Sequence, residues 1–114
     1  MPTTVTQIAT IPSEEDTSSA INVRAAMSGQ MSIPDNFKGT TVTFQTKVSD
    51  EAEESYQDLP EDEDGAPIAV VVEAGNNYPI PAVVLQGAFA LKLVSDVPQD
   101  EDDECPIRIG LFTN

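Results

Sequence analysis

Apolar and polar residues alternate with a period of two along several short segments of the chain. The clearest case is TTVTFQTKV, in which Val42, Phe44, Thr46 and Val48 share one face and polar residues occupy the other. Successive side chains of a β-strand point to opposite faces, so this alternation predicts a strand with one buried face.

The segment at residues 105–112 has the same pattern and predicts a last strand. Its apolar residues alternate with Arg108, Gly110 and Phe112, which we expect to face outward. Nine prolines and six glycines interrupt the chain, and helical periodicity is weak throughout. Residues 80–86 are compatible with either one helical turn or a strand. Further strand signals lie in the following segments: residues 5–11, 20–24, 29–33, 55–59, 67–74, 78–80 and 88–95.

Eight or nine short strands at regular spacing are typical of an all-β fold. We therefore predict a single antiparallel β-sandwich or jelly-roll-like domain of about eight strands with acidic loops. The domain is expected to span residues 5–114, after a short flexible arm at residues 1–4. A chain of 114 residues can bury one core without disulfides or a metal ion.

The charge of the chain is strongly negative. Twenty acidic residues, five basic residues and no histidine give a net charge of −15. Nucleic acids and anionic membranes are therefore excluded as partners, because both need a basic surface. Sixteen of the acidic residues fall in four clusters between predicted strands: Glu14–Asp16, Asp50–Glu54, Glu61–Asp64 and Asp100–Glu104.

The residue types that carry most enzyme chemistry are scarce. The absence of histidine from the sequence removes the commonest general base, and a single cysteine cannot form a paired metal or redox motif. We expect a protein that is not an enzyme, with no catalytic residues, cofactor or metal ligands. We also expect Cys105 to be inert, because it follows an acidic run that disfavours its thiolate.

The sequence contains two weaker site candidates. Asp62, Asp64 and Gly65 resemble part of a calcium-binding loop, but Pro60 and Val71 stand where two ligands are required. Solvated loops are the favoured interpretation, and weak binding of multivalent cations across loops is the alternative. Tyr78 lies in a turn-rich segment that could present it to a ligand, although a position in the core or at its rim is favoured.

Several short patterns occur along the chain in a fixed order. They are ATIP with SxAI (Ala9–Pro12 and Ser19–Ile21), Pro34–Gln45, Tyr56–Leu59, Val72–Tyr78 and Lys92–Ser95. In this order they resemble a recurring small protein of tailed bacteriophages, over about residues 7–112. The chain departs from the family pattern at residues 49–55, where an acidic segment replaces a glycine-rich turn.

The resemblance implies a β-sandwich virion protein, most plausibly a cement or decoration protein. Its expected partners are the major capsid protein and two further copies of itself in a homotrimer. It is expected on the outer surface of the head, after synthesis in the cytoplasm of the bacterial host, since the sequence contains no recognisable export signal.

Two alternative functions remain open at this stage. A tail or fibre component that binds a host-surface glycan would need exposed aromatic residues, which are few here. An acidic DNA mimic would need its carboxylates on one face, whereas the four clusters are expected at different points around the sandwich.

The N-terminal segment is the candidate contact with another subunit or with the capsid. Val5, Ile8 and Ile11 lie in the longest uncharged stretch at either end of the chain. Such a segment can add as a strand to a neighbouring sheet. The alternative is that it forms the first strand of its own sandwich.

The charge generates the first prediction. Clustered carboxylates repel each other, and the Debye length falls from about 10 Å at 0.1 M salt to about 3 Å at 1 M. The free energy of unfolding in urea should therefore rise with sodium chloride concentration. Divalent cations should act at millimolar levels without stoichiometry, so one tight, saturable calcium-binding event in calorimetry would contradict this prediction.

Overall fold

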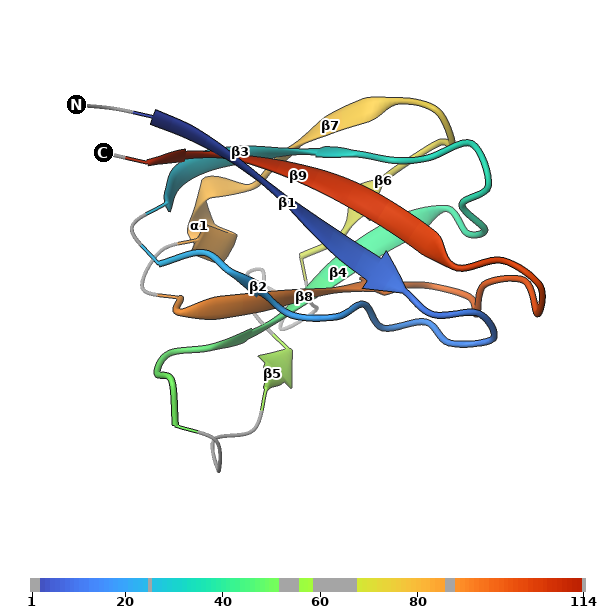
Figure 1. Ribbon diagram of the computed structural model, residues 1–114, viewed down its shortest axis with the longest axis horizontal. Helices are drawn as coiled ribbons and strands as arrows, with labels where there is room; N and C mark the ends of the chain where they lie inside the picture. Colours follow the sequence, from blue (N-terminus) through green and yellow to red (C-terminus); the bar gives the residue numbers. More distant parts are fainter. Residues whose placement is uncertain (1–2, 25, 52–55, 59–67, 86–87, 114) are drawn as a thin grey trace.

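Two antiparallel sheets pack face to face (Figure 1). The computed structural model describes residues 3–24, 26–51, 56–58, 68–85 and 88–113. The first sheet contains, in spatial order, β1 (Thr3–Ile11), β9 (Cys105–Thr113), β3 (Ala26–Ser32) and β7 (Asn77–Ile80). The second contains β2 (Ile21–Asn22), β8 (Ala90–Ser95), β4 (Thr41–Lys47) and β5 (Gln57–Asp58), with β6 (Val70–Val71) also paired to β4.

The chain passes repeatedly from one sheet to the other. Strands β1, β3, β7 and β9 belong to the first sheet, and the strands that follow or precede them along the chain belong to the second. The spatial order is β1-β9-β3-β7 in the first sheet and β2-β8-β4-β5 in the second. These are the strand orders of a jelly roll, in which two sheets enclose one core. The predicted all-β sandwich is confirmed.

The alternating segments supply the core, as their patterns predicted. In β4, Val42, Phe44 and Thr46 are buried between half-exposed polar neighbours. In β9 the buried residues are Cys105 and every second residue after it, through Leu111. Burying each large aliphatic or aromatic side chain contributes about 1.5–3 kcal/mol, so these two strands supply a large part of the driving force.

Some segments differ from the sequence predictions. Val48 lies beyond the end of β4 and is exposed. Of the predicted strand at 67–74, only Val70–Val71 pairs in the described part, since it meets β4 at just two positions. Thr3 and Thr4, placed in an arm by the sequence analysis, pair with β9 at Thr113 and Phe112. Residues 80–86 contain the short helix α1 (Ala82–Leu85), which buries Val84 and Leu85.

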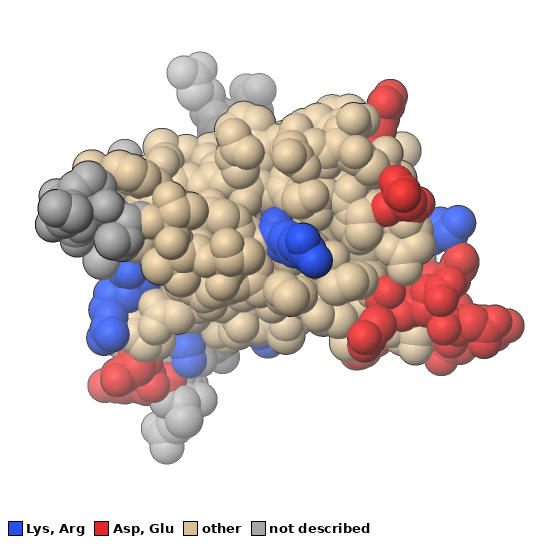
Figure 2. Space-filling model, turned by 45° about the horizontal axis from the view of Figure 1, so that its top comes forward, with Lys and Arg blue, Asp and Glu red and all other residues tan. Residues whose placement is uncertain are grey.

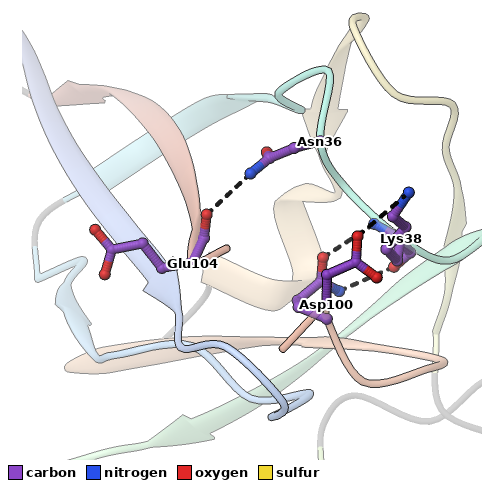
Figure 3. A network of polar contacts seen from close by, with 5 residues as sticks. Asn36, Lys38, Asp100 and Glu104 are labelled. Atoms are coloured by element: carbon purple, nitrogen blue, oxygen red, sulfur yellow. Dashed lines mark hydrogen bonds and ion pairs between the residues drawn. The ribbon is translucent and has the colours of Figure 1, made fainter. Parts of the chain in front are cut away.

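Neutral hydrogen bonds anchor the acidic loop between β8 and β9 (Figure 3). Buried Gln99 accepts a hydrogen bond from the Lys38 amide at 2.9 Å and donates one to the Lys38 carbonyl at 2.9 Å. Asn36 donates to the Glu104 carbonyl at 3.0 Å. The Lys38–Asp100 ion pair, at 3.6 Å, is half exposed and contributes little beside these bonds.

Asp96 joins the beginning of β4 to the end of β8. Its carboxylate accepts hydrogen bonds from the amides of Thr40 and Thr41, at 2.8 and 3.2 Å, and from the Thr40 hydroxyl at 2.9 Å. Slight desolvation of this exposed carboxylate alone would raise the pKa of Asp96, but these hydrogen bonds together outweigh it and lower the pKa. The ionised form therefore stabilises the fold.

The Asp96→Asn variant tests this contact. A carboxyl whose pKa is lowered by folding stabilises the protein above the unfolded pKa, about 3.9, and loses that effect as the pH falls through the folded value. At pH 7 we expect a loss of about 1 kcal/mol or less, since the group is exposed, and no loss at strongly acidic pH. Urea unfolding across this pH range measures the difference.

Removing any one carboxylate also reduces the net negative charge, so a control is needed. Glu101→Gln makes the same change in charge on an exposed loop residue. Identical unfolding free energies for the Asp96 and Glu101 variants at every pH would contradict the proposed stabilisation.

Candidate interaction surface

The first sheet has a continuous outer face, which follows from the alternation of β9. Its outward residues lie beside outward residues of the neighbouring strands in antiparallel register. We call this set the outer face: Thr4, Thr6, Ile8 and Thr10 of β1; Pro106, Arg108, Gly110 and Phe112 of β9; Ser28, Gln30 and Ser32 of β3; Asn77 and Pro79 of β7.

Acidic residues are missing from the positions that define the outer face, although the chain carries a charge of −15. Arg108 is the one charged residue among these positions. Two large apolar side chains are exposed there, Ile8 at 53% and Phe112 at 41%. Figure 2 shows a broad surface without acidic side chains, with most of the red side chains gathered toward the right. The outer face is therefore suited to contact with another surface.

A hollow of about 380 Å³ lies in the outer face around Gly110. Phe112, Pro79 and Gln30 are among the residues that line it. A Cβ atom built on Gly110 would meet no atom within 4 Å, so packing within the chain does not require glycine there. Glycine inside a strand weakens it and is found where another group approaches the backbone closely. The hollow therefore leaves the Gly110 backbone open to approach by another group.

Two of the acidic clusters lie together at one end of the sandwich. The Glu14 amide donates to the Asp100 carbonyl at 3.3 Å, and the Gln99 amide donates to the Glu15 carbonyl at 2.9 Å. Glu14–Asp16 and Asp100–Glu104 are thus neighbours, although the four clusters were expected at different points around the fold. Glu53, Glu54 and Glu61–Asp64 of the other two clusters lie outside the described residues. In the described part of the chain, no group of three or more acidic or thiol side chains is placed to hold a metal ion.

The predicted contact residues are divided between the two sides of β1. Ile8 lies opposite Arg108 and faces outward. Ile11 lies opposite Cys105 and is fully buried in the core. Val5 also faces the inner side, opposite Leu111, but it is 42% exposed because it lies near the open end of the sandwich. Only Ile8 therefore belongs to the outer face.

The remaining candidates have structural positions. The Tyr78 hydroxyl accepts a hydrogen bond from the Glu73 amide at 2.8 Å, and the ring packs against the core. Cys105 is buried, and its burial raises the thiol pKa to about 11. Asp62, Asp64 and Gly65 lie outside the described residues.

Alternation in the sequence predicts that Arg108, Gly110 and Phe112 face outward, but it does not connect them with Ile8. The available signal was an exposed phenylalanine and a glycine on one face of a strongly alternating strand. What joins them to β1 is the pairing of the first strand with the last, which no local pattern shows.

Comparisons with known proteins give information on the fold. No family model matches the chain, and no curated protein matches it by sequence. Among solved structures, the chain is similar to the SPBc2 prophage-derived protein YomS, with a TM-score of 0.57 and 8% identity. The match covers 99% of this chain and 96% of that one. At this identity the similarity establishes a shared fold over the whole chain.

No helix in the described residues is long and apolar enough to cross a membrane.

Proposed function

We propose that the protein is a structural component of a bacteriophage virion, a cement or decoration protein that binds the outside of the head. Its partner is the major capsid protein, and the contact is made by the outer face. The observation that carries the proposal is the separation of this uncharged, partly apolar face from the acidic loops.

Charge supports this choice of contact surface. A surface that binds a protein shell must lose its water, and burying unpaired carboxylates is costly. The outer face carries none at its defining positions, so only Arg108 needs a polar or acidic partner on the shell. The acidic loops then remain in solvent, where they reduce nonspecific adhesion to nucleic acid and cell surfaces.

Binding alone is sufficient for the proposed function. A protein that binds the assembled shell, and not its dissociated subunits, stabilises the shell by mass action. Repetition over many equivalent sites adds to the stabilisation of the particle. No catalytic group is needed.

Two further observations favour a phage protein. The sequence patterns from Ala9 to Ser95 resemble a small virion protein of tailed phages, and a protein with the same fold is derived from a prophage. The jelly roll is also a common architecture of viral capsid domains.

The Gly110→Val variant tests the role of the outer face. Valine should fill part of the hollow and favour the strand, so the isolated protein should be as stable as the wild type or up to about 1 kcal/mol more stable. Its affinity for heads of the parent phage that lack the protein should fall at least about tenfold, equivalent to about 1.4 kcal/mol. Cosedimentation with such heads measures the affinity, and thermal denaturation measures stability.

Two controls make this experiment specific. Thr43→Val places the same side chain on the other sheet and should leave binding unchanged. Glu15→Gln changes the acidic end; a loss of binding in this variant alone would move the contact to that end and contradict the proposal. Failure of the wild type to bind heads, with density for it on the tail in cryo-electron microscopy, would identify a tail component instead.

A further inference from the structure

Strand β1 has a free edge on the side opposite β9. The Thr10 amide donates to the Ser19 hydroxyl at 3.1 Å, and the Thr10 carbonyl accepts from the Ser19 amide at 2.8 Å. Both backbone groups of Thr10 therefore point away from β9. Alternate residues of a strand point their backbone groups to the same side, so those of Thr4, Thr6 and Ile8 do likewise. These three residues have no backbone partner on that side in the described part of the chain.

We infer that this edge pairs with the same edge of a second copy of the chain, antiparallel and across a two-fold axis at Thr6. This dimer takes the place of the homotrimer that the sequence resemblance implies. In this register Thr6 lies opposite the partner's Thr6, and Thr4 lies opposite the partner's Ile8. Each opposed pair exchanges two backbone hydrogen bonds, so every free group of the three residues is used. The two first sheets then form one continuous sheet.

Neighbouring registers are less favourable. A shift by two residues in one direction brings the partner's strand to Thr10, whose backbone groups are already bonded to Ser19. The opposite shift moves the partner of Ile8 beyond Thr3, the first residue of β1, so Ile8 is no longer opposite the described strand. The register centred on Thr6 therefore satisfies the most backbone groups.

The side chains of β1 also fit a second copy. The segment Thr3–Ile11 contains no charged residue and no proline, and these are the usual protections of an exposed edge. On the inner side of the strand, Val5 lies opposite the partner's Gln7 in the inferred register. Val5 and Ile8 are exposed in the single chain, and the pair removes part of their apolar surface from water.

Charge favours an antiparallel, two-fold related arrangement of the second copy. Each copy carries −15, and its acidic end lies beyond Ile11 and Cys105, at one end of β1. An antiparallel pair places the two acidic ends at opposite ends of the dimer, where their repulsion is weakest. Of the other described edge strands, β7 has four residues including Pro79, and β2 and β5 have two each. Only β1 offers a long free edge among them.

Cysteine cross-linking of the purified protein tests the register directly. Opposed Cα atoms in such pairs are about 5.5 Å apart, within the usual range for disulfides. A Thr6→Cys variant should therefore form a disulfide-linked dimer, whereas Thr4→Cys and Ile8→Cys should cross-link efficiently only when mixed with each other. Thr43→Cys, on the other sheet, is the matched control. The native thiol does not interfere, because Cys105 is buried.

Sedimentation equilibrium gives an independent measurement. The wild type should form a species of twice 12.2 kDa, with an association that strengthens at higher salt. Thr6→Pro removes one free N–H that does not bond to β9, so it should weaken dimerisation at least tenfold while an unchanged circular dichroism spectrum shows that the fold is kept.

A wild-type protein that is monomeric at all concentrations, a trimer, or a dimer unaffected by Thr6→Pro would overturn the inference. Equal cross-linking of the Thr6 and Thr43 variants would overturn it as well. The experiment uses no phage heads, so its outcome is independent of the proposed function.

Discussion

The pairing of the last strand with the first and the third holds the molecule together. Strand β9 pairs with β1 over nine residues, from Ile11–Cys105 to Thr3–Thr113, and with β3 on its other side. Its inward residues are the centre of the core beneath the first sheet, and its outward residues are the centre of the outer face. The core and the candidate contact surface therefore depend on one register, because a slip of one residue would exchange the two faces.

Like-charge repulsion is the second constraint, and it decides where side chains are placed. A chain with a charge of −15 folds only if its carboxylates stay in solvent and apart from the core. In the described part of the chain most of them lie outside the strands, and the loop between β8 and β9 is held by uncharged groups such as Gln99 and Asn36. Confining the acidic residues to loops leaves the first sheet with an outer surface that another protein can cover at low electrostatic cost.

The sequence predicted those features that depend on local alternation. The strands at β4 and β9 and their buried residues follow from period-two patterns, since each strand needs one apolar face. The position of Ile8 shows what local alternation predicts and what it does not. Residues three apart in a strand face opposite sides, so the alternation itself separates Ile8 from Val5 and Ile11. Ile8 lies beside Arg108 because the first strand pairs with the last. No local sequence pattern shows this pairing.

The free edge of β1 and the outer face are geometrically coupled. When strands pair antiparallel, opposed residues point to the same side, so Thr4, Thr6 and Ile8 of both copies lie on one surface of the joined sheet. The two outer faces then point in similar directions, apart from the twist that accumulates across strands. For the proposed contact with a capsid shell, a dimer of this kind presents two copies of the hollow at Gly110 and two of Arg108 on one side. Binding at the first makes the second intramolecular, so a weak contact per copy is enough for stable attachment, provided that the shell repeats with a matching spacing.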